Sequence, residues 1–316
     1  MVCAVERRDT EHRRRSRMRE VSGRCQYRQS YCQRVCVSLS PIDTLSLHTV
    51  TGGVRAKFST PLCAYNTTNR RVLTMSEPPN RSLRQRTLPV LTKVLHGSAP
   101  FISTFLLIHL SAPMLANLGG SSLASQTMLL DREYYQTDFG EKYLLLAPLT
   151  AHTLSGLIKR VVSPPKAPPR PWTSLLSLTG YANMLLFLPV HFMAHRVAPA
   201  DSTAPIHELS PSELDFEYVK FALTKWPVRS WFLYGGLVLC AVLHTVEGQR
   251  LLYNTYAPAA RIGAAAGKRL RAAGLALIAL PVLSGVWALG REPPLVFPSM
   301  VSRFESSFRQ VFWYRV

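Results

Sequence analysis

The sequence lacks the motifs on which most soluble enzymes depend. It has no glycine-rich phosphate-binding loop, no serine or cysteine nucleophile motif and no pair of carboxylates at a catalytic spacing. Acidic residues are scarce overall, with 18 Asp and Glu against 37 Lys and Arg among 316 residues. We therefore expect a protein that is not an enzyme.

Cysteine is scarce as well, and most of the cysteines lie near the N-terminus. The chain has six cysteines, and five of them come before residue 64: Cys3, Cys25, Cys32, Cys36 and Cys63. The short spacing between Cys32 and Cys36 is not repeated elsewhere, so neither a disulfide framework nor a zinc site is expected. Cys240 stands inside an apolar run, where a thiol commonly packs as a small apolar side chain.

The first 93 residues lack long apolar runs and are expected to be a disordered basic segment. Residues 1–74 carry 14 basic and 5 acidic side chains, and they contain no apolar region of the kind found in secretory signals. Two interpretations stay open: a segment like a mitochondrial transit peptide, or an upstream extension of the reading frame before Met75.

Long apolar runs begin after this segment. They lie at about 94–118, 143–162, 173–197, 228–250 and 270–290, and each is near the roughly 20 residues that span a bilayer core. The sequence therefore predicts an all-α, multi-pass membrane protein, in which 94–290 form a bundle of about five transmembrane helices and 291–316 a C-terminal tail. The Pro, Gly, His, Ser and Thr residues inside the runs are typical of helices packed on one another.

The loops between these runs alternate in charge. Segments 81–93, 159–170 and 250–271 carry basic residues and no acid, whereas 131–141 and 201–217 carry the acidic ones. This asymmetry predicts a cytosolic N-terminus and a C-terminus on the other side, and it explains the positive charge without a nucleic-acid partner.

Two loops have further features. The proline-rich segment 163–171 predicts a stiff connector, for which a simple crossover between two helices is the favoured explanation. Pro169 and Pro171 are the alternative, as candidate partner contacts. Apolar residues at helical spacing within 213–225 predict a short interfacial helix, with Trp226 after it at headgroup level.

Histidines inside the predicted spans form the main site hypothesis, because ionisable side chains in a bilayer usually face the bundle interior. They are His109, His152, His191, His195 and His244. One turn after His152 and His244 stand Gly156 and Gly248, which leave room beside each imidazole for a flat ligand.

Two neutral imidazoles on neighbouring helices are the usual axial ligands of haem b in membrane cytochromes. Counting residues from the acidic ends of the spans places His109 and His152 at one depth, so they are the candidate axial pair. His191 and His244 differ in depth by about 15 Å and are weaker candidates. Alternatively, each histidine donates a hydrogen bond to a neighbouring helix, worth about 0.6 kcal/mol on average, or lies on a metal or proton path.

Several stretches together resemble a fungal family of mitochondrial outer-membrane adaptors with a five-helix domain, found as suppressors of defects in the ER–mitochondria encounter structure. The matching stretches are Arg132-Glu-Tyr-Tyr-Gln136 with Pro148-Leu-Thr-Ala-His152-Thr-Leu-Ser-Gly156, Ser177-Leu-Thr-Gly-Tyr181 with His191, and Trp226-Pro227 with His244-Thr-Val-Glu-Gly248. They cover about residues 96–252.

The resemblance implies a non-enzymatic role in mitochondrial lipid homeostasis, recruiting a bridge-like lipid-transfer protein of the vacuolar protein sorting family. It also implies a likeness to the haem-binding membrane subunits of succinate dehydrogenase and fumarate reductase. Family members recruit their partner through an N-terminal Pro-x-Pro motif, whereas here Pro169-Arg-Pro171 lies in a later loop.

Overall fold

The computed structural model describes residues 83–163 and 170–315, which are 84% helical and contain no strand. Four helices are long and apolar enough to cross a membrane: Leu83–Tyr135, Leu175–Ala200, Pro227–Tyr256 and Ala264–Arg291. The prediction of an all-α membrane protein is confirmed. The predicted disordered segment lies almost wholly outside the described residues, and so does Pro169.

Helix α2 (Leu83–Tyr135) is a helical hairpin, because it breaks at Gly119 and Gly120. Gly120 has a φ of +61°, a conformation that side-chain-bearing residues rarely adopt. Beyond the break the chain returns beside its first arm, since the Ser111 hydroxyl donates to the Asp131 carboxylate at 3.2 Å. The stretch after residue 118, which sequence assigned to an acidic loop, therefore contains a helical arm that runs back into the bundle.

The other elements follow in the order of the chain. The π-helix η1 (Gly140–Leu146) leads into α3 (Ala147–Val162), and the next run comprises α4 (Leu175–Ala182), η2 (Asn183–Phe187), α5 (Leu188–Phe192), η3 (Met193–Val197) and η4 (Ala198–Ala200). Then come α6 (Phe216–Lys225), α7 (Pro227–Tyr256), η5 (Pro258–Ala260), α8 (Ala264–Gly274), η6 (Leu275–Ala279), α9 (Leu280–Arg291), α10 (Pro298–Gln310) and η7 (Phe312–Tyr314). The predicted span 143–162 thus corresponds to η1 and α3, which are not among the four long apolar helices.

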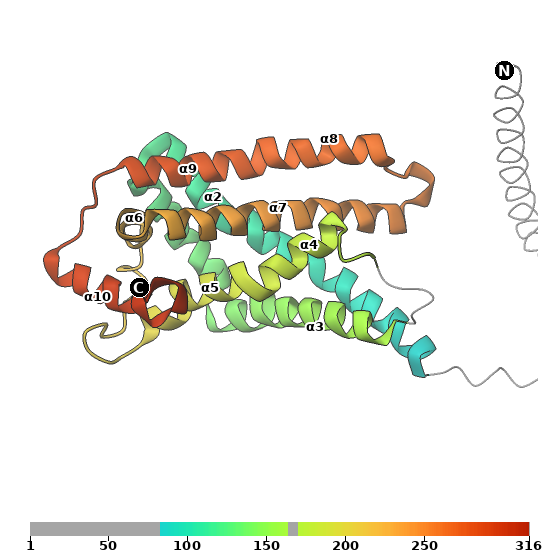
Figure 1. Cartoon of the computed structure of the whole chain (residues 1–316), viewed down its shortest axis with the longest axis horizontal. Helices are drawn as coiled ribbons and strands as arrows, with labels where there is room; N and C mark the ends of the chain where they lie inside the picture. Colours follow the sequence, from blue (N-terminus) through green and yellow to red (C-terminus); the bar gives the residue numbers. More distant parts are fainter. Residues whose placement is uncertain (1–82, 164–169, 316) are drawn as a thin grey trace, which may run out of the picture. The chain divides into compact units, whose positions relative to one another are not determined.

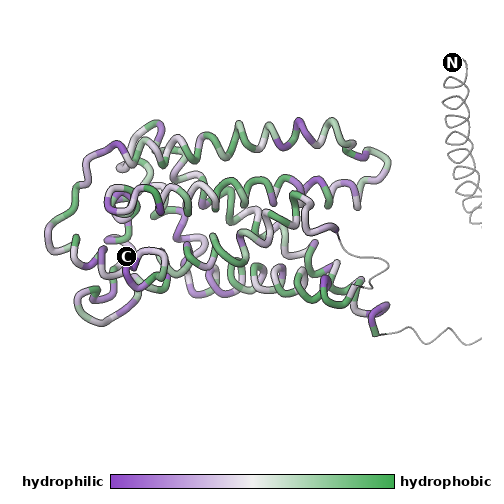
Figure 2. The backbone as a smooth tube through the Cα atoms, viewed as in Figure 1, coloured by the Kyte–Doolittle hydropathy of each residue, from purple (hydrophilic) through white to green (hydrophobic). Residues whose placement is uncertain are grey.

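The described helices have two chemically different ends. The end of α3, the start of α4 and the α7–α8 connection share one end, whereas α6, α10 and the C-terminus share the other (Figure 1). Hydrophilic residues gather near these ends and hydrophobic ones along the helices between them (Figure 2). The basic segments 159–163 and 250–271 therefore lie at one end of the bundle, as the charge alternation predicted.

The end formed by α6, α10 and the C-terminus is called the acidic end below, because the acidic loop 201–217 leads into α6 there. Its elements pack on one another as a cap. Tyr218 of α6 is buried and stacks on Phe308 of α10 with ring centres 4.3 Å apart. Its hydroxyl bonds the Ala194 carbonyl and the Ser307 hydroxyl, each at 2.9 Å. Trp226, which sequence placed at headgroup level, is buried against Phe308 instead. The apolar face of α6 faces α10, so part of the predicted tail 291–316 is a structural element.

Candidate functional site

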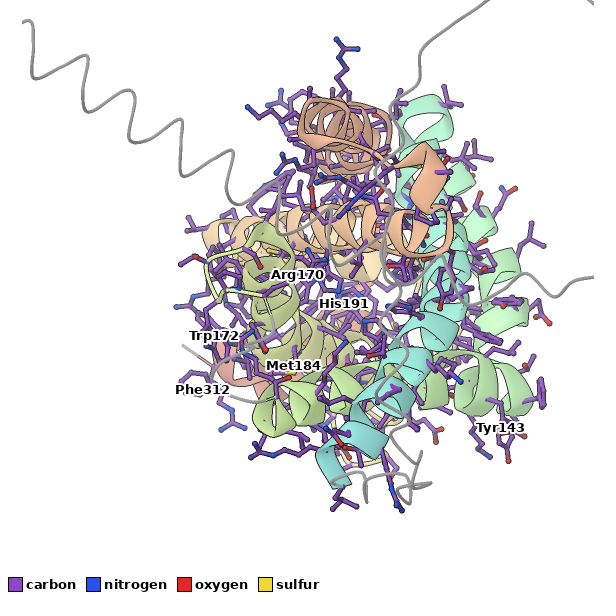
Figure 3. All side chains as sticks on the ribbon, turned by 90° about the vertical axis from the view of Figure 1, so that its right-hand side faces the viewer. Tyr143, Arg170, Trp172, Met184, His191 and Phe312 are labelled. Carbon is purple, nitrogen blue, oxygen red and sulfur yellow. The ribbon has the colours of Figure 1, made fainter. Side chains whose placement is uncertain are left out.

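A cavity of about 570 Å³ lies between α2, α3, the α4–η3 run and α7. This volume is in the range of small-molecule and cofactor sites, which are typically apolar with a few polar groups. Most of the lining is apolar, and the ring nitrogens of six histidines interrupt it: His96, His109, His152, His191, His195 and His244. Seen from the basic end, His191 lies in the interior while Tyr143 and Trp172 lie on the outside (Figure 3).

His152 of α3 and His244 of α7 face one another across this cavity. Their ring centres are 6.2 Å apart and their planes are nearly perpendicular, at 83°. Two imidazoles that bind one metal from opposite sides, through bonds of about 2 Å each, have ring centres about 6 Å apart. The pair therefore has the spacing of two axial ligands.

Hydrogen bonds fix both rings from behind. Nδ1 of His244 lies 3.0 Å from the Leu176 carbonyl and so carries the proton, which leaves Nε2 as the basic nitrogen. Nδ1 of His152 lies 3.1 Å from the Ser98 hydroxyl, which itself donates to the Leu95 carbonyl. Such bonds to the far nitrogen are the usual means by which proteins orient a metal-binding histidine.

Glycines explain how the surrounding helices come this close. A Cβ at Gly180 of α4 would lie 2.8 Å from Cε1 of His244, so only glycine lets α4 bring its carbonyl to the imidazole. At Gly248 an added Cβ would meet no atom within 4 Å, and at Gly156 only a Leu95 methyl at 3.7 Å. Both of these glycines line the cavity, next to the space that a flat ligand would occupy.

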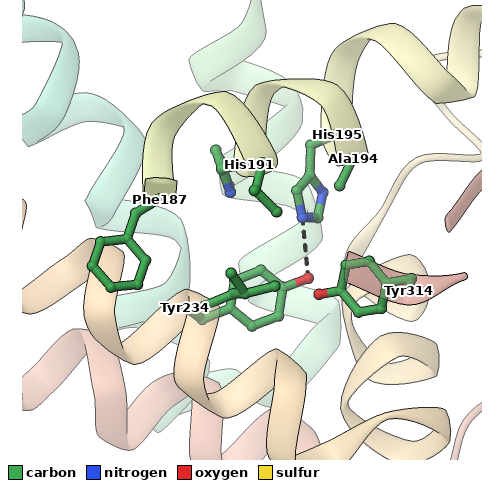
Figure 4. A pocket seen from close by; sticks show the side chains of 8 residues that line it. Phe187, His191, Ala194, His195, Tyr234 and Tyr314 are labelled. Carbon is green, nitrogen blue, oxygen red and sulfur yellow. Dashed lines mark hydrogen bonds between the residues drawn. The ribbon is translucent and has the colours of Figure 1, made fainter. Parts of the chain in front are cut away.

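A second group of histidines lies nearer the cap. The ring centres of His109 on α2 and His191 on α5 are 5.9 Å apart at an interplanar angle of 76°. His195, one turn after His191, is bonded through Nε2 to the Tyr234 hydroxyl at 3.0 Å (Figure 4). The Tyr234 and Tyr314 hydroxyls point toward one another in the same view.

The structure does not bring His109 and His152 together, although sequence proposed them as a pair. His152 contacts Ser98, which stands eleven residues before His109 on α2, or about 16 Å along the helix axis. The depth count assumed that α3 starts at the acidic end. The second arm of α2 runs back from the acidic end to the depth of His109, where the Tyr135 hydroxyl lies 3.4 Å from Nδ1 of His109. The chain therefore enters η1 and α3 from that depth and not from the acidic end.

Sequence reasoning missed the groups that support the histidines. Ser98, Tyr135 and Tyr234 bond the imidazoles, and only Ser98 carries a local signal, as a hydroxyl within an apolar run. Among the described residues, no group of three or more His, Cys, Asp or Glu could hold a metal ion. Each histidine pair supplies two nitrogens, which suits a metal whose other positions are filled by a macrocycle.

The proposed docking prolines are described only in part. Pro171 is exposed at the basic end, beside Trp172, whose side chain is 60% exposed. The guanidinium of Arg160 lies 3.6 Å from the centre of the Trp172 ring and donates to the Arg170 carbonyl at 2.8 Å. This arrangement holds an aromatic ring and a cation together on the outer surface.

Fold and composition define the class: a multi-pass helical membrane protein with an interior cavity lined by histidines. No protein-family model, curated protein or solved structure matches the chain.

Proposed function

We propose that this chain is a membrane adaptor in mitochondrial lipid homeostasis whose helical bundle binds haem b. The two parts of the proposal depend on different observations and fail independently. The haem-binding part has the stronger geometric support, and the facing imidazoles of His152 and His244 carry it.

The residues around this pair fit haem by two criteria. Both rings are held through Nδ1, so that each presents Nε2 as the nitrogen for a ligand. The space next to Gly156 and Gly248 is open on the cavity side. Haem in such a site would supply one-electron chemistry, while the protein sets its ligands and excludes water.

An absorption spectrum of the purified full-length protein tests this part. We expect a Soret band and sharp visible bands of a six-coordinate, low-spin haem, both reduced in His152→Ala and His244→Ala variants. His96→Ala is the matched control, because His96 also lines the cavity but bonds the Tyr256 hydroxyl at 3.0 Å and belongs to neither pair. A protein without a Soret band after expression with excess haem would overturn the proposal.

The adaptor part is supported by the family resemblance and by the surface at the basic end. Arg and Trp are the residues most often found at the energetic centre of protein interfaces. Here the stacked Arg160 and Trp172 adjoin the exposed Pro171, in the loop where the sequence has Pro169-Arg-Pro171. We propose that this surface faces the cytosol from the mitochondrial outer membrane and binds a lipid-transfer protein of the vacuolar protein sorting family.

Recruitment of the partner to mitochondria measures this directly in cells. We expect a combined Pro169→Ala, Pro171→Ala and Trp172→Ala variant to lose recruitment while staying in the membrane. Trp287→Ala is the matched control, since Trp287 on α9 is 57% exposed and also lies near an arginine, with Arg291 at 5.5 Å. Undiminished recruitment by the triple variant, also after deletion of residues 1–82, would reject the proposed contacts.

A further inference from the structure

The cavity reaches the outer surface of the bundle between α3 and the α4–η3 run. Leu157 of α3 and Phe192 of α5 line it, and their side chains are also 41% and 38% exposed. Both residues stand inside apolar runs of the length that spans a bilayer core. The cavity therefore meets lipid hydrocarbon at these two side chains, and we call this opening the lateral seam.

The two walls of the lateral seam pack on different partners. α3 packs against the first arm of α2, where Lys159 donates to the Thr92 hydroxyl at 2.8 Å. The α4–η3 run packs against α7, where His244 is bonded to the Leu176 carbonyl at 3.0 Å. Each wall is thus held from behind, so the walls can separate while both keep these contacts.

Polar contacts across the seam lie at its two ends. Near the cap, Arg196 of η3 donates two hydrogen bonds to the Glu141 carboxylate, at 2.7 and 2.8 Å, and both residues line the cavity. At the basic end, the Arg160 guanidinium lies 5.7 Å from the centre of the Tyr181 ring. A bidentate arginine–carboxylate pair is among the stronger polar contacts in proteins. The Glu141–Arg196 pair is therefore the contact that would hold the seam closed near the cap.

The α4–η3 run has the features of a wall that bends. Its η2 and η3 segments are π-helical, and Pro189 stands between them. π-turns and prolines are among the usual causes of helix bends. A bend at Pro189 would move Phe192 and Arg196 away from α3 while α4 stays packed on α7.

We infer that the lateral seam is a portal through which the cavity exchanges its ligand directly with the bilayer, and that the Glu141–Arg196 pair is its latch. The ligand is a largely apolar molecule dissolved in the membrane. This inference depends on the proposed haem-binding function, under which that molecule is haem b, and it adds the route by which haem enters. Leu157 directly follows Gly156, so the seam opens beside the place proposed for the macrocycle.

The competing route is entry from water at the basic end, where His96 and Lys159 also line the cavity. Hydrogen bonds between α2 and α7 cross that end. Nδ1 of His96 lies 3.0 Å from the Tyr256 hydroxyl, and the Gln249 amide donates to the Ser103 hydroxyl at 2.9 Å. A ligand entering there would have to break these bonds, whereas one entering by the lateral seam passes between apolar side chains.

The rate of haem transfer from the full-length protein in proteoliposomes to apomyoglobin tests the latch. We expect Glu141→Gln combined with Arg196→Gln to raise this rate at least about tenfold, with haem content unchanged, because charge-assisted hydrogen bonds no longer hold the seam closed. The exchanged pair, Glu141→Arg with Arg196→Glu, should restore slow transfer. Glu305→Gln with Arg309→Gln is the matched control, since that 2.7 Å ion pair lies in the cap and outside the cavity lining. An equal acceleration in this control would overturn the inference.

Narrowing the seam tests the lateral route itself. We expect Leu157→Trp to slow haem transfer severalfold. Leu154→Trp should leave it unchanged, because Leu154 is exposed on the same helix but does not line the cavity. In protein that carries haem, unchanged transfer in either the Glu141 and Arg196 double glutamine variant or Leu157→Trp would overturn this inference and leave the proposed function standing. A protein without haem would overturn both.

Discussion

Gly248 lies one turn after His244 on α7 and lines the cavity, where an added Cβ meets no atom within 4 Å. A leucine there has space in the protein but occupies the region proposed for the macrocycle. We predict that Gly248→Leu lowers haem content at least severalfold without lowering thermal stability. Replacing glycine within a helix with leucine itself contributes about 0.5–1 kcal/mol to stability.

The matched control is Gly235→Leu on the same helix. An added Cβ at Gly235 also meets nothing within 4 Å, but this residue does not line the cavity. Haem content and the melting temperature, measured together for both variants, separate blocked binding from damaged folding. Equal haem content in the two variants would contradict the placement of the macrocycle beside Gly248.

Glu213 and Arg303 connect the loop before α6 to α10 at the acidic end. Two hydrogen bonds lower the pKa of the Glu213 carboxyl. The larger effect comes from the Arg303 guanidinium and the smaller from the Ser210 amide, which donates at 2.7 Å. A lowered folded-state pKa contributes stability above the unfolded-state pKa of about 4.3, and this stability is lost as the pH falls through the folded-state value.

We therefore predict that Glu213→Gln reduces stability at pH 7 by up to about 1 kcal/mol, the upper end for partly exposed ion pairs. The difference from the unaltered protein should vanish as the pH falls below the lowered pKa of Glu213. Thermal unfolding followed by tryptophan fluorescence between pH 7 and pH 3 measures it. A difference that persists or grows in acid would mean that the carboxylate does not stabilise the docking of α10.

At the scale of elements, α2 and α9 approach one another closely at a glycine. A Cβ on Gly285 of α9 would overlap the carbonyl oxygen of Pro113 and come 3.1 Å from the Asn117 amide nitrogen. That amide donates to the Pro281 carbonyl of α9 at 2.8 Å, so the two helices are also hydrogen-bonded here. Small residues at such crossings are the usual basis of close helix packing in membranes.

We predict that Gly285→Ala destabilises the bundle by about 1–3 kcal/mol, the usual cost of overpacking. Gly290→Ala on the same helix is the control, because its Cβ would meet Leu223 at an ordinary 3.6 Å. Thermal unfolding in detergent measures both. If both variants unfold at the same temperature, α2 and α9 are not in contact at Gly285.

The sequence patterns predicted the apolar helices, but not which residues of neighbouring helices lie at the same depth. The return arm of α2 carries Gln126, Asp131 and Glu133 and so has the composition of a loop, although it is helical and packed. Within the spans, η1, η2, η3 and η6 are π-helical. Each π-turn inserts a residue and rotates the following side chains by about 100°, so residue spacing alone could not pair His109 with His191.

At the scale of the whole chain, the described helices run back and forth between two ends (Figure 1). The first arm of α2, the α4–η3 run and the η6–α9 run lead toward the cap, whereas η1 with α3 and α7 lead away from it (Figure 1). Residue 83 and the C-terminal η7 therefore lie at opposite ends. Because basic ends face the cytosol in membrane proteins, we propose that the cap faces the other compartment.

Labelling of single cysteines in intact mitochondria tests this orientation. Arg261 at the basic end and Ser202 at the cap end are both exposed, so each is replaced by cysteine in a chain whose six native cysteines are serine. We predict that a membrane-impermeant maleimide modifies Arg261→Cys in intact organelles, whereas Ser202→Cys reacts only after the outer membrane is opened. Because the two positions are predicted to lie on opposite sides, simultaneous labelling of both before opening would rule out an odd number of crossings between them. The reverse order would instead place the Arg160–Trp172 surface away from the cytosol, where it could not recruit a cytosolic lipid-transfer protein.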